Sequence, residues 1–389
     1  MPGGKLSALR SVFDGFETFL FTPNDTAGAV GAHIHDANDS KRTMIIVVTA
    51  LLPCFLFGMY NTGYQHWLST GAGNFPFWGL MLYGFLAVLP RVVACYFVGL
   101  GIEFIVAQWR KEEIQEGFLV TGILIPMICP VNTPVWMIMV ATAFSVIFVK
   151  EVFGGTGFNV INVALAARAF LFFAYPKQMS GSDAFVATEP VCGLGGTAVD
   201  GFSGATPLGE IATATGSDQV LAALGSMRDA FIGLIPGSFG ETSTLCILIG
   251  AAILLFTGMA SWKIMLSGVL GALAMGWVAY SFPSDIYPAS YMAPCRHLLY
   301  GGLLFAIVFM ATDPVTSCRT EVGKWVYGAL VGIIAVVIRV YNSGYPEGAM
   351  LAVLLMNVFA PLIDHCVVQA NVSRRLRRAK ANSKTSCRL

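Results

Sequence analysis

The sequence predicts an all-α polytopic membrane protein with about ten transmembrane helices. Hydrophobic residues make up 56% of the 389 residues, and charged residues make up only 12%. The mean hydropathy is +0.71, which lies far outside the range of soluble globular proteins. Apolar stretches recur near the length of about 20 residues that a helix needs to cross a bilayer. The net charge of +1 indicates no general attraction to nucleic acid, so the lipid bilayer is the predicted environment.

Ten apolar stretches are candidate spans. The second is long enough for one over-length helix or for two helices that meet at Pro90. We expect one helix, because a break would reverse all later spans and place the basic C-terminal tail outside. The stretch "AFIGLIPGSFGE" before the sixth span is predicted to be re-entrant, because irregular backbone at membrane depth must lie against protein or a water-filled cavity. The ten spans are 43–60, 77–107, 117–131, 135–149, 162–175, 242–260, 264–282, 297–312, 325–340 and 348–368.

The distribution of Lys and Arg predicts that both termini are cytoplasmic. With the N-terminus inside, the tail "RRLRRAKANSKTSCRL" also lies inside, and the outside segments 61–76, 132–134 and 341–347 contain no Lys or Arg. The first residues lack the apolar core and cleavage site of a signal peptide. The predicted division is a cytoplasmic N-terminal segment 1–42, a first five-helix repeat 43–175, a periplasmic loop and re-entrant segment 176–241, a second five-helix repeat 242–368 and a basic cytoplasmic tail 369–389.

Two stretches of the sequence resemble each other. "GFLVTGILIPMICPV" begins at Gly117, and "GGLLFAIVFMATDPV" begins at Gly301. In both, a Trp follows the Pro, and a basic residue, Lys150 or Arg339, follows the Trp by fourteen positions. Two repeats of five spans must be inverted relative to each other, and such repeats place functional sites near their interface at mid-membrane. Chance similarity between apolar helices is the alternative.

Glu103, Arg168, Asp313 and Asp364 are ionisable residues that lie within predicted spans or at their ends. A charge at the centre of a spanning helix costs about 2.5–3.5 kcal/mol on insertion, so such residues indicate function. We expect an ion or quinone role for Glu103 and Asp364, whereas a structural ion pair or a place near the interface explains Arg168 and Asp313 equally well. The nine cysteines are scattered without a CxxC pair, so no metal site beyond a path for a transported ion is predicted.

A glycine cluster precedes the fifth span. Gly154, Gly155 and Gly157 are followed by Asn159 and Asn162, which share one helix face. Glycines let a planar ligand approach the backbone, and two amides can bind the edge of a heterocycle. A turn before the helix, with Asn as its cap, accounts for the same spacing.

The longest polar interval contains "DGFSGATPLGEIATATGS", from Asp200 to Ser217, on the predicted outer side. A flexible linker, a phosphate cradle, a pore-lining loop and a modification site are all compatible with it. Thr206 has no nearby His to activate its hydroxyl, so nucleophilic catalysis is not indicated. Composition alone favours a flexible loop.

"SGATPL", from Ser203 to Leu208, resembles the signature at which a transferase joins FMN through its phosphate to a threonine. With "KEVFGGTG", "AFIGLIPGSFGETSTL", "ATDPV", "YPEGAMLA" and "APLIDH", the chain resembles the NqrB/RnfD family over about residues 40–370. This family contains a subunit of the sodium-translocating NADH:quinone oxidoreductase and one of the Rnf complex. "FLFTPNDTAG" and "FGMYNTGYQ" are more similar to the quinone-reductase branch.

The resemblance implies a set of site residues. Thr206 would carry FMN, and Asn159 and Asn162 would lie beside a riboflavin. The chain reads Asn162-Val163-Ala164-Leu165 where the family usually has N-P-A-L, and it has Leu100 where some members have glycine. The remaining implied residues are Ser203, Gly204, Ala205 and Leu208 for recognition by the transferase, Gly99 and Glu103 for quinone, and Glu103 and Asp364 for sodium.

The resemblance also implies a function. The chain would be a membrane component of a sodium-pumping complex in a bacterial inner membrane, and would pass electrons through its flavins to ubiquinone. Its partners would be the other five subunits, NqrA, NqrC, NqrD, NqrE and NqrF. The sequence has no NADH-binding motif, so we do not expect the chain to oxidise NADH alone. An RnfD-type subunit of a ferredoxin:NAD+ oxidoreductase, a redox-inactive transporter and a structural scaffold are the alternatives.

Overall fold

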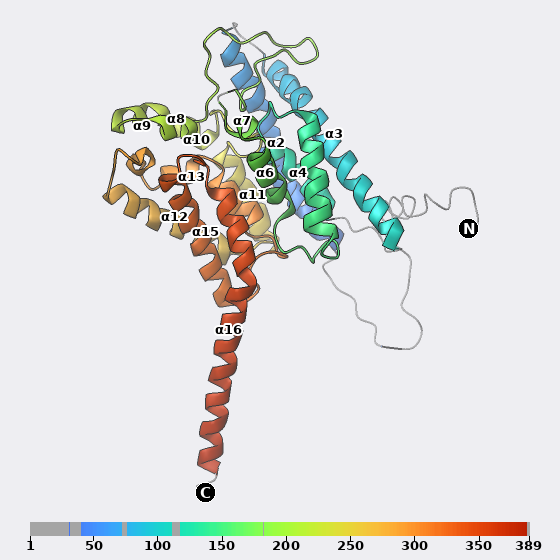
Figure 1. The fold of residues 1–389 in the computed structure, drawn as a ribbon, viewed down its shortest axis with the longest axis vertical. Coiled ribbons are helices and arrows are strands. Elements are labelled where there is room, and N and C mark those ends of the chain that lie inside the picture. The colour runs from blue at the N-terminus through green and yellow to red at the C-terminus, as the bar shows by residue number, and fades with distance from the viewer. Residues whose placement is uncertain (1–30, 32–39, 72–75, 111–116, 182, 387–389) are drawn as a thin grey trace, which may run out of the picture.

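The fold is a bundle of helices, and the computed structural model describes residues 31, 40–71, 76–110, 117–181 and 183–386. Most of the predicted N-terminal segment 1–42 lies outside these residues. In the first half, the helices are α2 Ser40–Thr70, α3 Phe77–Arg110, α4 Phe118–Ile128, α5 Val135–Ser145 with its π-helical continuation η2 Val146–Glu151, and α6 Val163–Ala174. In the second half, they are α11 Thr244–Phe256, α12 Trp262–Ser281, α13 Arg296–Leu299, α14 Leu303–Phe305 with the π-helical η4 Ala306–Met310, α15 Glu321–Tyr341 and α16 Ala349–Ser386. The two halves lie side by side (Figure 1).

Between the halves, short helices and irregular backbone replace long spans. These helices are α7 Pro176–Ser180, α8 Pro207–Thr213, α9 Ser217–Leu224 and α10 Met227–Ile232, and the short 3₁₀ helix η3 Pro288–Tyr291 lies later in the chain. Residues 233–243 follow α10 without regular structure, yet Ser238, Phe239 and Glu241 are buried. The N–H of Gly240 donates to the carbonyl of Met127 at the end of α4 (2.7 Å). This non-helical backbone therefore lies against protein, as the prediction of a re-entrant segment requires.

Within the described part of the chain, five helices are long and apolar enough to cross a membrane, namely α2, α3, α12, α15 and α16. The prediction of one helix over the second span is confirmed, because α3 continues through Pro90. Proline removes one backbone donor without ending the helix. The side chain of the next residue, Arg91, donates to the carbonyl of Ala87 in the same helix and, at 3.0 Å, to that of Thr133. Three other predicted spans are the shorter apolar helices α4, α6 and α11.

The structure differs from the prediction at the eighth span, 297–312. It is a short helix, α13, then a break, and then α14 with η4. Gly301 and Gly302 at the break have φ angles of +66° and +63°, a left-handed backbone that only glycine adopts without strain. Two consecutive left-handed residues end the helix, so the span cannot be continuous.

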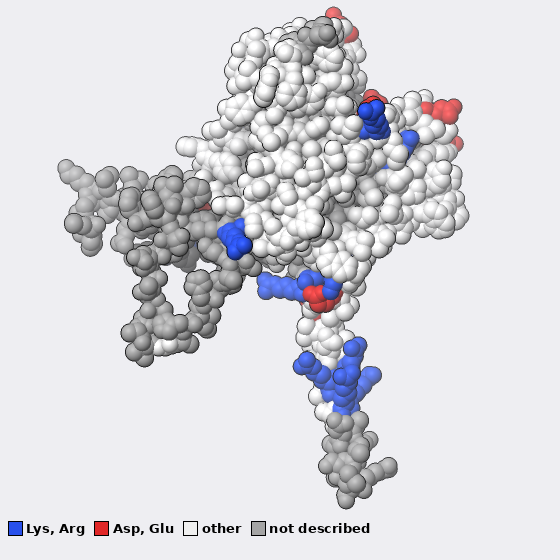
Figure 2. All heavy atoms as spheres, turned by 180° about the vertical axis from the view of Figure 1, so that it is seen from behind, with Lys and Arg blue, Asp and Glu red and all other residues white. Residues whose placement is uncertain are grey.

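The basic tail continues α16 as a helix. The sequence places the end of the last span at 368, whereas the helix runs to Ser386. Its C-terminal part projects beyond the rest of the bundle (Figure 1). Figure 2 shows basic side chains gathered on this projection, and the described ones are Arg374, Arg375, Arg377, Arg378 and Lys380.

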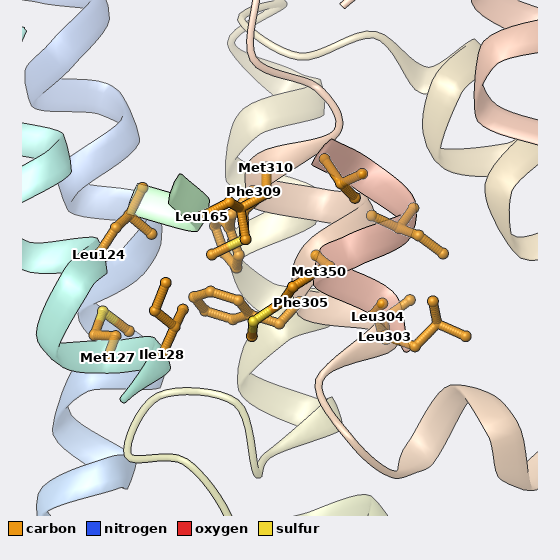
Figure 3. Close-up of a cluster of buried hydrophobic side chains, with 14 of the residues drawn as sticks. Leu124, Met127, Ile128, Leu165, Leu303, Leu304, Phe305, Phe309, Met310 and Met350 are labelled. Atoms are coloured by element: carbon orange, nitrogen blue, oxygen red, sulfur yellow. The ribbon is translucent and has the colours of Figure 1, made fainter. Parts of the chain in front are cut away.

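The core lies where the short helices of the two halves meet. Leu124, Met127 and Ile128 of α4 point toward Phe305, Phe309 and Met310 of α14 and η4 (Figure 3). All six side chains are buried, as are Leu165 of α6 and Met350 of α16 beside them. Lipid is as apolar as these side chains, so close packing and dispersion hold such contacts together. These contacts fix the short helices at the centre of the protein, where the backbone groups at the helix ends can contribute to binding sites.

Helix pairs around this core approach through glycine. A Cβ atom on Gly332 of α15 would lie 2.1 Å from the carbonyl oxygen of Gly268 on α12. A Cβ on Gly84 of α3 would lie 1.8 Å from the carbonyl oxygen of Met59 on α2. Small residues let helix backbones touch in membranes, so the framework around the sites is rigid.

Candidate cofactor sites

Thr206 is the residue before α8 and caps this helix. Its hydroxyl oxygen accepts a hydrogen bond from the N–H of Gly209 (3.2 Å), and Pro207 follows at the first helical position, where its missing N–H costs nothing. Leu208 and Ile211 are buried and hold α8 against the bundle. The expectation of a flexible loop from composition is therefore wrong for α8 and α9, since capping and two buried side chains make this stretch helical.

A cavity lies beside Thr206, and we call it the Thr206 cavity. Three irregular segments converge on it: the backbone before α11, the break between α13 and α14, and the loop before α16. The residues that line it are Thr206, Pro207, Leu208, Ile235, Pro236, Gly237, Ser238, Glu241, Thr242, Leu299, Tyr300, Gly301, Gly302 and Glu347.

The Thr206 cavity contains a buried ionic cluster. Arg168 of α6, which is 2% exposed, makes an ion pair with Glu347 and a longer one with Glu241 (3.5 Å). It also donates to the hydroxyl of Ser238 (3.0 Å). One guanidinium thus faces two carboxylates, and the cluster carries one net negative charge if both are ionised. The structural ion pair expected for Arg168 is present.

Glu241 and Glu347 were not predicted as site residues. Each follows a stretch of glycine and proline, in "PGSFGE" and "YPEG". An acidic residue that follows glycine and proline and directly precedes an apolar span could have indicated a buried acid at a site. Only the fold brings these two distant acids to one arginine.

A second cavity lies at the start of α4 and α6, and we call it the Asn cavity. Asn162 caps α6, since its Oδ1 accepts from the N–H groups of Ala164 (3.0 Å) and Leu165 (3.2 Å). The capping alternative is therefore confirmed. Asn162 and Asn159 both line the cavity with Thr43, Met44, Val47, Gly117, Val120, Thr121, Leu124, Lys150, Thr156, Val163, Leu254, Met259, Ala260, Phe309, Thr312, Asp313, Pro314 and Val315.

Polar groups of the Asn cavity retain unused hydrogen-bonding capacity. The hydroxyl of Thr156 is buried and has no partner, and the Nδ2 of Asn162 donates one long hydrogen bond (3.5 Å) to the carboxylate of Asp313. A heterocycle with alternating donors and acceptors fits such a lining. The glycines Gly154, Gly155 and Gly157 all have positive φ, so the turn after η2 explains them without a ligand.

Glu103 lies next to the Asn cavity through an ion pair with Lys150. Both side chains are about 5% exposed, and the ammonium of Lys150 also lies 5.9 Å from the centre of the Phe118 ring. The same ring fills the space at Gly99, where a Cβ would lie 1.8 Å from it. The structure therefore brings Gly99, Glu103 and the Asn cavity together, with Lys150 as a link that the sequence analysis did not include among the site residues.

Asp364 lies apart from this cluster, with partners of its own. Its carboxylate accepts from the N–H of Arg319 (2.7 Å) and from the N–H (3.1 Å) and hydroxyl (2.6 Å) of Thr320. These bonds fix α16 to the start of α15. Among the described residues, the partners of Asp364 differ from those of Glu103, and the structure does not join the two acids.

Comparison with known proteins assigns the chain to a family. It is 43% identical to the B subunit of the Na(+)-translocating NADH-quinone reductase from Klebsiella pneumoniae over 405 residues, which cover 96% of this chain and 95% of that protein. It is 42% identical to the proteins of the same name from Pseudomonas paraeruginosa and Ectopseudomonas mendocina, each over 398 residues that cover 97% of this chain and 96% of the relative. The model of the NQR2, RnfD, RnfE family matches residues 28–373. The chain therefore belongs to the NQR2, RnfD, RnfE family.

Proposed function

We propose that this chain is the membrane subunit of a sodium-pumping NADH:quinone oxidoreductase, with covalent FMN on Thr206 and riboflavin in the Asn cavity. The observation that carries the proposal is that the two sets of residues expected to hold flavins each line a separate cavity. Both cavities lie beside a broken helix near the interface of the two halves. Family membership and the names of the relatives agree with this function.

The surroundings of Thr206 are compatible with a phosphoester. Its side chain is half-buried at the cavity, and its oxygen serves α8 as an acceptor, a role that an ester oxygen retains. Ser203 is exposed and Ala205 is half-buried in the irregular backbone before α8, so a transferase would reach these two, whereas Gly204 and Leu208 are buried in the folded chain. FMN supplies electron transfer when bound, while the protein fixes its place and electrostatic surroundings.

Riboflavin in the Asn cavity would meet Asn159, Asn162 and the free hydroxyl of Thr156. Quinone would bind near Gly99 and Glu103, on the other side of Phe118. Lys150 lies between these two places, so a negative charge that arrives in the Asn cavity attracts the same ammonium that neutralises Glu103. Loss of that partner leaves the carboxylate ready for Na+, which would couple electron transfer to sodium uptake.

Asp364 would act later on the sodium path, near the cytoplasmic end of α16. The three hydrogen bonds from residues 319 and 320 give it a structural role as well. Within the bacterial inner membrane, with both termini in the cytoplasm, the chain would assemble with NqrA, NqrC, NqrD, NqrE and NqrF and reduce ubiquinone.

Mass spectrometry of the peptide that contains Thr206, from the purified complex, tests the proposal. We expect the added mass of FMN less water, and a fluorescent band at the mass of this chain on a denaturing gel. Thr206→Val should abolish both signals, whereas Thr213→Val, in the same short helix, should leave them intact. An unmodified Thr206 in the complex assembled in its native membrane would refute the covalent site and favour a redox-inactive transporter.

The RnfD-type alternative differs in its electron donor. Inner-membrane vesicles of the native host should show quinone reduction by NADH that rises with Na+ and disappears in Thr206→Val. Activity with ferredoxin in place of quinone would instead favour the Rnf branch, which the family also includes.

A further inference from the structure

Arg339 is a buried cation whose partners are all neutral. It lies in the last turn of α15 and is 2% exposed. Its guanidinium donates to the carbonyls of His297 (2.6 Å), Tyr300 (3.0 Å) and Glu347 (3.1 Å). Among the described residues, no carboxylate lies within ion-pair distance of it, although the carboxylate of Glu347 attracts it from farther away. Its Nε has no hydrogen-bond partner. A buried charge without a counter-ion is unfavourable unless other interactions compensate it.

Arg339 also lines a cavity of about 190 Å³, which we call the Arg339 cavity. One wall is α8, the helix that Thr206 caps, through Leu208, Ile211 and Ala212. The opposite wall includes Tyr287 and Tyr341, whose rings meet edge to face at 5.0 Å. The lining is otherwise apolar or neutral, with Ile286, Pro288, Ala289, Val340, Ser343 and Pro346. This cavity suits a flat aromatic ligand that carries negative charge.

The Thr206 and Arg339 cavities meet at Leu208 and Gly301. Leu208 lines both of them. A Cβ on Gly301 would lie 2.2 Å from the side chain of Leu208 and 2.9 Å from the guanidinium of Arg339. Gly301 and the side chain of Leu208 therefore lie at the boundary between the two cavities. The phosphate and ribityl chain of FMN provide the reach to pass them.

Charge decides which of the two cavities suits a reduced flavin. The Thr206 cavity contains Glu241 and Glu347 with one shared arginine. The Arg339 cavity has a single charged residue in its lining, and that residue is a cation. Flavin gains negative charge near N1 and C2=O when it is reduced, and nearby protein charge tunes this step. The reduced ring is thus repelled in the first cavity and stabilised in the second.

We propose that the isoalloxazine ring of the flavin on Thr206 lies in the Arg339 cavity, with Arg339 as the counter-ion of its reduced form. This inference rests on the proposed function and adds the place and the electrostatic partner of the ring. Arg339 also supports the α13 break through its carbonyl contacts, so a purely structural role is the competing explanation. The two explanations differ in what a substitution does to the flavin itself.

The test is a spectroscopic redox titration of the covalent flavin in the purified complex, with the flavin content of the chain measured by in-gel fluorescence. In Arg339→Gln, we expect the ratio of reduced to oxidised flavin at a fixed potential to fall about tenfold, which is ~30 mV for a two-electron couple. Arg339→Lys, which keeps the charge, should recover most of the loss. Arg228→Gln removes an exposed cation of the same face and should leave the titration unchanged.

A second variant avoids the carbonyl contacts of Arg339. Ala212→Leu narrows the Arg339 cavity from the α8 side, and we expect it to shift the titration in the same direction and to change the fluorescence of the bound flavin. Unchanged titrations in both Ala212→Leu and Arg339→Gln would overturn the inference. If Arg339→Gln does not assemble, an unchanged titration in Ala212→Leu alone would overturn it. A wild-type chain without covalent flavin would instead overturn the proposed function, so the two failures are distinguishable.

Discussion

The region around Lys150 and the region around Arg339 have similar structures but different charges. Each basic residue lies near the C-terminal end of a helical segment, η2 or α15, and contacts the start of a short helix or the break before one, through Phe118 of α4 or Gly301 before α14. Lys150 is neutralised by Glu103, whereas Arg339 contacts only carbonyls. Fourteen positions before Gly117 and Gly301, the sequence has Glu103 in one half and Tyr287 in the other. The presence of Glu103 in one half and of Tyr287 at the corresponding position of the other therefore accounts for the difference in charge.

This difference indicates two uses of a buried cation. A cation with an internal carboxylate can exchange partners when charge arrives nearby, which suits the coupling of an electron to an ion. A cation without a carboxylate stabilises an anion permanently, which suits a bound redox group.

The largest effect should come from removal of Glu103. Glu103→Leu leaves Lys150 buried without a carboxylate, and loss of one partner of a buried ion pair costs about 3–5 kcal/mol. We expect a large fall in the thermal stability of the complex and loss of sodium-dependent quinone reduction. Glu103→Leu with Lys150→Met should regain most of the stability but none of the sodium dependence, measured by thermal unfolding in detergent and by Na+ titration. A double variant as unstable as the single one would show that the pair is not the source of the loss.

The sequence predicted the elements better than the contacts between them. Hydropathy and the basic tail were sufficient to identify α3 as one helix through Pro90, because membrane topology leaves few alternatives. The break at Gly301 and Gly302 was not predicted, since two glycines in an apolar stretch do not reveal their φ angles. Family resemblance pointed to Thr206 and Leu208 in the lining of one cavity and to Asn159 and Asn162 in that of the other. The role of Lys150 and of the acids around Arg168 depends on distant segments meeting, which no local pattern encodes.

Asn162 caps α6, and in the proposed function it also binds riboflavin; two substitutions separate these roles. Asn162→Ala removes the cap of α6, which costs about 1 kcal/mol, and also removes the amide from the Asn cavity. Asn162→Ser keeps a capping oxygen but not the amide. We expect both variants to lose riboflavin about tenfold more readily on dilution, followed by chromatography of the extracted flavins. Only Asn162→Ala should unfold at a lower temperature, and unchanged riboflavin retention in both would exclude a binding role.

Tyr287→Glu should make the region around Arg339 resemble the region around Lys150. A carboxylate in the lining of the Arg339 cavity competes for the guanidinium, so the covalent flavin should become harder to reduce. We expect the ratio of reduced to oxidised flavin at a fixed potential to fall severalfold, less than in Arg339→Gln because the cation remains. Tyr287→Phe is the matched control and should change little. An easier reduction in Tyr287→Glu would contradict the assignment of the ring to this cavity.

The smallest effect is expected at the exposed ion pair of Lys263 with Glu321, which shares its carboxylate with Lys324. The side chain of Glu321 is 63% exposed, so water and salt screen its interactions, and such pairs contribute little to stability. Glu321→Gln should leave thermal unfolding, flavin content and sodium dependence unchanged in the same assays that detect Glu103→Leu. Because both substitutions remove a carboxylate bound to lysine, this contrast isolates burial as the cause. A loss at Glu321 comparable to that at Glu103 would mean that charge number, and not the buried position beside a cavity, determines the effect.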